Sequence, residues 1–150
     1  MMKKILLTIL AGLLVFSWGV TALAAPASLS SSSRGNVSNL ITVKKPESTL
    51  SSTTKKNYAL SAVGSSGTEV GVYKWNGSSY ALCGSGTIGA SGIYVRQLSL
   101  SSGMNRLAVW AGKGNNSQVV RLEINLVDAS VLNGISNYKI NIQSVLKGWV

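Results

Sequence analysis

The fold is decided by residues 69–83, which read EVGVYKWNGSSYALC. Large and small side chains alternate on both sides of Asn76-Gly77, as they do in strands with one buried face. Asn and Gly both tolerate positive φ, so this dipeptide between alternating runs is the strongest short signal for a β-hairpin. The stretch therefore predicts two antiparallel strands joined by a tight turn.

Short β-rich runs continue in both directions from this hairpin. Clusters of Gly, Ser and Asn separate them, at spacings close to the 8–12 residues typical of a β-sandwich. No run between them has a helical period. The sequence predicts an all-β fold, an antiparallel β-sandwich of about seven strands over residues 40–127. The expected strands are 40–44, 58–63, 69–75, 79–83, 93–100, 105–111 and 117–127.

The period of two separates a core face from a solvent face. In the last strand Leu122 and Ile124 alternate with Arg121 and Glu123, so a slip of one residue would bury two charges. The register is therefore well specified, and the same pattern in the other strands gives the expected core. It consists of Tyr58, Leu60, Ala62, Val70, Val72, Tyr94, Leu98, Leu100, Leu107, Val109, Ala111, Val120, Leu122, Ile124 and Leu126.

Composition restricts the chemistry that the chain can perform. The 150 residues include 14 Lys and Arg, 4 Asp and Glu, and no His. Without His, the usual general base and the usual activator of a Ser or Cys nucleophile are missing. The four carboxylates share no local motif, and one Cys excludes internal disulfides and multi-thiolate metal sites. We expect one small domain that is not an enzyme and has no catalytic residues, metal site or cofactor.

Residues 1–25 have the order of a secretory signal peptide. A basic start precedes an apolar run over 5–20, and small residues then offer a cleavage site after Ala24 or Ala25. The apolar run is shorter than the roughly 20 residues of a membrane-spanning helix. We expect cleavage, no transmembrane span afterwards, and a product that is secreted or associated with the cell surface. The alternative is an uncleaved membrane anchor.

Two segments flank the expected sandwich. Residues 26–39 include four consecutive serines and too few apolar side chains to pack, so they predict a flexible leader. Residues 128–150 carry an apolar stripe at helical spacing, although part of the stripe also alternates as in a strand. This favours a short helix or an irregular segment that packs on the sandwich. The stripe comprises Val131, Ile135, Tyr138, Ile142, Val145 and Trp149.

Three motifs carry a family resemblance. They are TEVGVY at 68–73, GIY at 92–94 and LSLSSGMNRLAVWA at 98–111. Together they resemble a bacterial immunoglobulin-like domain, over roughly residues 40–127. The resemblance implies a spacer or adhesive module of exported surface proteins, or a module beside the catalytic domain of a secreted enzyme. Turn glycines and core positions make up the motifs, so they indicate a fold and not a ligand.

Two residues depart from the simple pattern. Arg96 falls on the core face of its strand, so either a bulge turns it outward or its guanidinium leaves the core at a strand end. Cys83 lies late in a strand, where a buried free thiol is favoured. The alternative for Cys83 is an intermolecular disulfide, which an odd Cys in an exported protein allows.

Aromatic side chains form the candidate binding site. The alternation that fills the core directs Tyr73, Trp75 and Trp110 to the opposite face, with Tyr80 as a candidate fourth member. Exposed rings on a flat sheet can stack on sugar rings or form a contact patch. The alternative, which the pattern favours, is that residues 128–150 pack across this face and cover the rings.

Charge indicates the class of partner. Removal of the signal peptide lowers the formal charge from +10 to +8, which attracts anionic partners. The densest clusters beyond it are Lys44-Lys45 and Lys55-Lys56. No run of five basic residues occurs, which favours lysines that merely keep strand edges soluble.

We therefore expect a non-catalytic module with a binding or structural role at a bacterial surface. Its partner would be a cell-wall polymer, a glycan or another surface protein, and not a nucleic acid. One alternative is a carbohydrate- or anionic wall-polymer-binding module. A small secreted hydrolase or inhibitor is a further alternative, from a different class.

Overall fold

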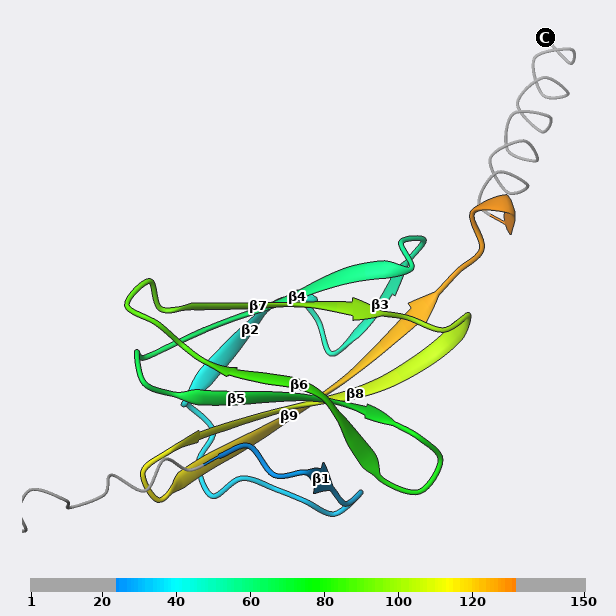
Figure 1. The fold of residues 1–150 in the computed structure, drawn as a ribbon. Helices are drawn as coiled ribbons and strands as arrows, with labels where there is room; N and C mark the ends of the chain where they lie inside the picture. Colours follow the sequence, from blue (N-terminus) through cyan, green and yellow to red (C-terminus); the bar gives the residue numbers. More distant parts are fainter. Residues whose placement is uncertain (1–23, 132–150) are drawn as a thin grey trace, which may run out of the picture.

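The computed structural model describes residues 24–131, and these form two β-sheets (Figure 1). The larger sheet has the order β1-β6-β5-β8-β9-β3 and the smaller one β2-β4-β7. The strands are β1 (Ser28–Leu29), β2 (Ile41–Lys45), β3 (Leu50–Thr53), β4 (Asn57–Gly64), β5 (Glu69–Trp75), β6 (Tyr80–Thr87), β7 (Ile93–Ser99), β8 (Gly103–Lys113) and β9 (Asn116–Leu126).

Two predicted segments lie mostly outside the described part of the chain. These are the signal peptide, of which only residues 24 and 25 are described, and the C-terminal segment, of which residues 128–131 are described. Residues 129–131 are helical. Between residues 24 and 131, no helix is long and apolar enough to cross a membrane.

The prediction of an all-β sandwich is confirmed, and the strand order is consistent with the immunoglobulin-like arrangement. The order β2-β4-β7 corresponds to strands A, B and E, and β9-β8-β5-β6 to G, F, C and C′. The expected seven strands correspond to β2 and β4–β9. One pair departs from the antiparallel arrangement, because β3 pairs with β9 in parallel, with Leu50 opposite Glu123. The pattern missed β1 and β3, which are short and rich in serine.

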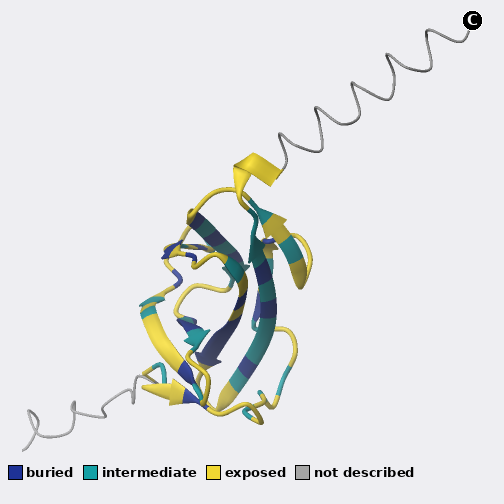
Figure 2. Ribbon diagram, turned by 90° about the vertical axis from the view of Figure 1, so that its right-hand side faces the viewer, coloured by how far each residue is buried: buried dark blue, intermediate teal, exposed yellow. Residues whose placement is uncertain are grey.

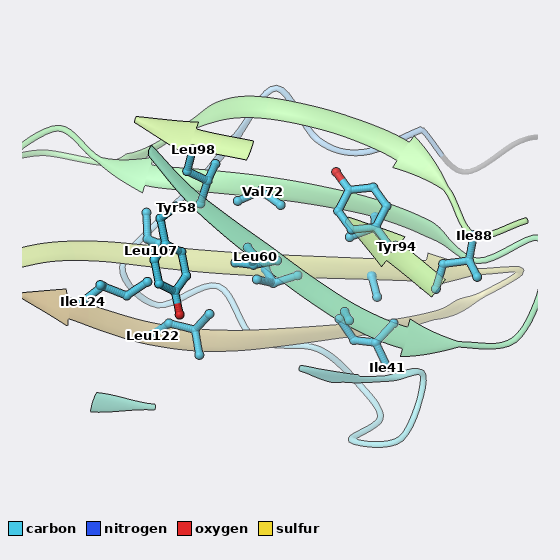
Figure 3. Close-up of a cluster of buried hydrophobic side chains, with 14 of the residues drawn as sticks. Ile41, Tyr58, Leu60, Val72, Ile88, Tyr94, Leu98, Leu107, Leu122 and Ile124 are labelled. Carbon is cyan, nitrogen blue, oxygen red and sulfur yellow. The ribbon is translucent and has the colours of Figure 1, made fainter. Parts of the chain in front are cut away.

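The predicted core is confirmed. Thirteen of its residues are buried together between the sheets, and Val120 and Leu126 are half-buried against them. Ile41 and Ile88 join them although the alternation did not include them. Figure 3 shows side chains of the smaller sheet, such as Leu60 and Tyr94, facing those of the larger one. In Figure 2 the buried positions, in dark blue, run along the strands, and the turns are mainly exposed.

The predicted hairpin at Asn76-Gly77 is confirmed. The Asn76 amide N–H donates to the Ser79 carbonyl oxygen over 3.0 Å. Its side-chain Oδ1 accepts from the Ser78 and Ser79 amides, and Gly77 has a φ of 106°. The return strand β6 runs to Thr87, well beyond the expected end at residue 83.

Cys83 is exposed, so the expectation of a buried thiol is wrong. Ala81 and Leu82 are exposed as well, so this part of β6 is open on both faces, and its register with β5 is irregular. Tyr73 pairs with Leu82 and Val72 pairs with Gly84, which leaves Cys83 as the extra residue of a bulge. A bulge reverses the side-chain alternation on its own strand, so a simple period of two could not place this thiol.

Arg96 leaves the core across the opening between the two sheets. It pairs with Leu60 in an unbroken β4–β7 ladder, so no bulge turns it outward. Its guanidinium lies against Gly84 of β6 and donates to the Cys83 carbonyl oxygen over 3.1 Å. A side chain at Gly84 would collide with the guanidinium. Arg96 therefore escapes burial in mid-strand by crossing to the other sheet.

Candidate functional site

The three predicted binding residues lie in one cluster on the outer face of the larger sheet. Tyr73 is fully buried there and Trp110 is 5% exposed, so both rings are covered, as the favoured alternative expected. Trp75 is half-buried at the rim of the cluster. Its ring meets Tyr80 edge-on, with 5.0 Å between the ring centroids. The strand alternation identified the correct face of the sheet.

The cover over these rings comes from the N-terminal leader. We call residues 25–33 the strap. In Figure 1 the strap, in blue, lies on the side of the larger sheet that faces away from β4 and β7. Leu29 of the strap is buried among Tyr73, Tyr80 and Trp110. The expectation of a flexible leader is therefore wrong for the strap. Whether residues 132–150 also contact this face lies outside the described residues.

Polar contacts hold the strap along its length. The Tyr73 hydroxyl donates to the Pro26 carbonyl oxygen over 2.7 Å. The Arg121 guanidinium donates to the carbonyl oxygens of Ser31 and Ser33, the latter over 2.9 Å. The same guanidinium lies 5.8 Å from the centre of the Tyr80 ring, a cation–π distance. The strap is therefore bound through backbone carbonyls and one apolar anchor.

The chain stays close to the sheet after the strap. The Asn36 side chain bonds the Asn115 carbonyl and the Ser117 amide, at the β8–β9 turn. The Val37 amide donates to the Ser117 carbonyl over 3.1 Å. Gly35 lies so close to the backbone of β9 that any side chain there would collide with it. These contacts fix the path from the strap to β2.

Burial raises the pKa of the Tyr73 phenol from 10 to about 12. Folding therefore favours the protonated phenol, and this part of the stability is complete below about pH 10 and is lost as the pH rises toward 12. We predict that Tyr73→Phe destabilises the protein by about 1 kcal/mol at pH 8, through loss of the bond to Pro26. The difference in free energy of unfolding between the parent protein and Tyr73→Phe should be smaller at pH 11.5. Urea unfolding of both proteins at the two pH values measures it, and a difference that is independent of pH would contradict it.

The predicted aromatic site is accessible only beside Trp75, where there is a small hollow. It has a volume of about 350 Å³ and is lined by Lys74, Trp75, Met104 and Arg106, among others. Lys74 Nζ donates to the Ser101 hydroxyl over 2.9 Å. Arg106 forms an ion pair with Glu123, with 3.4 Å between Nε and Oε1. The hollow thus offers one accessible aromatic edge between two cations.

A larger and more basic cleft lies where the chain passes from one sheet to the other. After β2 ends at Lys45, the buried Pro46 directs the chain away from the smaller sheet toward β3. This crossing leaves a cleft of about 580 Å³, which we call the basic cleft. Its lining is Lys44, Lys45, Pro46, Glu47, Ser48, Ser51, Ser52, Thr53, Lys55, Asn57, Tyr58 and Ala59.

The basic cleft carries uncompensated positive charge. Lys44, Lys45 and Lys55 are exposed, and none of them forms an ion pair within residues 24–131. Glu47 is the single carboxylate in the lining. Lys45 Nζ lies 5.7 Å from the centre of the Tyr58 ring, which restricts this ammonium group to the cleft wall. Three ammonium groups thus lie next to hydroxyl groups, and both kinds of group can donate hydrogen bonds to the oxygens of an anion.

Sequence reasoning noticed the two lysine pairs but did not place them together. Lys44-Lys45 and Lys55-Lys56 are separated by nine residues, and only the crossing from β2 to β3 and back to β4 brings Lys44, Lys45 and Lys55 to one opening. No protein-family model and no curated protein matches this chain. Its function therefore has to be inferred from the basic cleft and the aromatic cluster.

Proposed function

We propose that the protein is an exported, non-catalytic immunoglobulin-like module that binds an anionic polymer of the cell surface at the basic cleft. The observation that carries this proposal is a group of three lysines, around a cleft rich in hydroxyl groups, that have no ion-pair partner within residues 24–131. The predicted signal peptide supports a location where such polymers occur.

The chemistry of the cleft favours a polymer over a small anion. Each exposed ammonium group remains hydrated, so a single contact contributes only about 0.2–1 kcal/mol. A polymer with repeated phosphate, sulfate or carboxylate groups engages several lysines at once, and several copies of the module along one polymer add to the retention. Ser52 and Thr53 can donate to the same anionic oxygens.

The positions of two of the four carboxylates support a non-catalytic role. Glu69 and Glu123 lie opposite Gly112 and Arg106 of β8, six residues apart, which corresponds to about 20 Å along the strand. A glycosidase pair needs a separation below about 10 Å. Glu69 accepts a hydrogen bond from the Thr87 hydroxyl over 2.6 Å, and Glu123 is the partner of Arg106. Both groups are engaged in local structure.

Neutralising the cleft should weaken the binding. We predict that the triple variant Lys44→Gln, Lys45→Gln, Lys55→Gln binds insoluble cell-wall fragments about tenfold more weakly than the parent chain at low salt. Added salt should weaken the binding of the parent protein steeply and that of the variant little, because salt screens only the charged contacts. Sedimentation of the protein with wall fragments over a salt series measures both effects.

The matched control is Lys113→Gln. Lys113 is also exposed, but its Nζ already donates to the Ser65 hydroxyl and the Ser66 carbonyl, far from the cleft along the chain. This variant should bind like the parent protein. Equal losses in the control and in the triple variant would mean that only net charge matters and would overturn the basic cleft as the site. Wall fragments stripped of their anionic polymers should retain neither protein.

A second candidate function rests on the hollow beside Trp75. The accessible edge of this ring, with Lys74 and Arg106 beside it, is suited to an acidic sugar that stacks on the indole. Retention that resists salt and is lost in Trp75→Ala would favour this candidate over the polymer in the basic cleft.

A further inference from the structure

The strap contacts the larger sheet as a bound peptide contacts a receptor. Ser28 and Leu29 pair antiparallel with Ala81 and Tyr80, which adds a two-residue strand at the edge of β6. Addition of an extended segment to a sheet edge is a common mode of peptide recognition, in which the backbone gives affinity and a pocket selects a side chain. Here the pocket is the aromatic cluster and the selected side chain is Leu29.

The remaining contacts are also made with the backbone of the strap and not with its side chains. The acceptors of Tyr73 and Arg121 are main-chain carbonyls of Pro26, Ser31 and Ser33. Residues 30–33 form a turn, in which the Ser33 amide donates to the Ser30 carbonyl over 3.2 Å. An incoming segment therefore needs a leucine in the right register, followed by this turn, to make the same bonds. The residues of the strap other than Leu29 are small or hydroxylated, so they add little side-chain packing.

Within the described part of the chain, the strap is joined to the sandwich through one connection. It precedes the domain in the chain, and residues 34–40 link it to β2. The strap is held by two backbone pairs, the Leu29 anchor and the bonds from Tyr73 and Arg121. It can leave its groove without unfolding the core, because its cluster is separate from the core between the sheets. An emptied groove would expose Tyr73 and Trp110, which favours refilling by a segment of the same kind.

We propose that the groove beneath the strap is a strand-accepting site that is filled in one chain by its own residues 25–33 and can accept the same segment of a second copy. The two arrangements share the contacts of residues 25–33, whereas exchange requires the contacts of residues 35–37 with β9 to be released. The balance between the arrangements depends on this cost, on protein concentration and on the effective concentration of the tethered strap. Exchange between copies would join exported modules through their N-terminal segments. This inference is independent of the basic cleft.

Disulfide trapping tests the proposal with full-length chains. Directly opposite residues of an antiparallel pair have Cα atoms about 4.5–5.5 Å apart, within the range that a disulfide spans. One chain carries Ser28→Cys and the other Ala81→Cys, and both carry Cys83→Ser to remove the native thiol. Ser28 and Ala81 are exposed, so neither change alters the aromatic cluster. The two chains are mixed and oxidised with glutathione disulfide, and the mixed dimer is quantified by mass.

The control pairs the Ser28→Cys chain with Ser99→Cys, an exposed residue of β7 in the other sheet. We expect at least about tenfold more mixed dimer with Ala81→Cys than with this control. Equal yields would mean that the chains meet only by collision and would overturn exchange. The double variant Ser28→Cys, Ala81→Cys in one chain should close its own disulfide, which verifies the register of the strap.

A synthetic peptide of residues 25–33 with Ser28→Cys tests the groove alone, because the peptide does not have to leave a folded chain before it binds. It should form a disulfide with the Ala81→Cys chain, and the same peptide with Leu29→Asp should not. The chain whose strap is locked by its internal disulfide should exclude a fluorescent 25–33 peptide, and its reduced form should admit it. Equal reaction of both peptides, or equal binding to the locked and reduced chains, would overturn the proposed groove.

Discussion

Replacement of Asn105 by alanine should lower the free energy of unfolding by about 3–5 kcal/mol, the upper end of what single substitutions cost. Asn105 is 2% exposed at the start of β8. Its Nδ2 donates to the carbonyls of Ser101, Gly103 and Ile124, over 2.7, 3.0 and 3.2 Å, and its Oδ1 accepts from the Ser101 amide over 2.8 Å. Alanine would remove all four bonds, of which the one to Ile124 is buried and those at Ser101 and Gly103 are partly buried. Each backbone group left unpaired away from water costs about 1–3 kcal/mol.

The same residue fixes the turn that leads from β7 into β8. The side chain closes the loop at Ser101 and at the same time bridges to β9 through Ile124, so its loss also frees the loop. Thermal and urea unfolding of Asn105→Ala and the parent protein measure the effect. The matched control is Asn125→Ala on the outer face of β9, which should stay within about 0.5 kcal/mol. A loss below 1 kcal/mol in Asn105→Ala would contradict the role assigned to the side chain.

The strands that could be predicted are those in which large side chains alternate. The run from Leu107 to Ala111 in β8 and the run from Val120 to Leu126 in β9 have only one register that keeps Arg121 out of the core between the sheets. The core residues of these strands could therefore be predicted directly. β1 and β3 have no such pattern. Each is held by its neighbour in space, β6 or β9, and this pairing is a tertiary contact that a local pattern does not contain.

The candidate sites also depend on tertiary contacts that a local sequence pattern does not contain. The face occupied by Tyr73 and Trp110 followed from alternation, but the cover did not, because the serines of the leader give no hint that Leu29 has a pocket. Cys83 could not be placed because the bulge reverses the alternation on its strand. The basic cleft depends on the crossing near Pro46, which determines which lysines meet.

Leu29→Asp should release the strap and lower the free energy of unfolding by about 2–4 kcal/mol. Leu29 is 6% exposed within the aromatic cluster, so the substitution removes apolar contacts worth about 2 kcal/mol or more and would bury a carboxylate without a partner. Release of the strap from the sheet avoids burial of the carboxylate but exposes Trp110. We therefore expect a red shift of tryptophan emission and binding of a hydrophobic dye, while the far-ultraviolet circular dichroism of the sandwich persists.

Ser28→Asp is the matched control, since it adds the same charge one residue away on the exposed side of β1. It should leave the emission spectrum unchanged and the stability within about 0.5 kcal/mol of the parent protein. The contrast between neighbouring residues separates loss of the apolar anchor from an effect of negative charge at the strap. If both variants behave alike in emission and in urea unfolding, Leu29 does not anchor the strap, and the aromatic face must be shielded by another part of the chain.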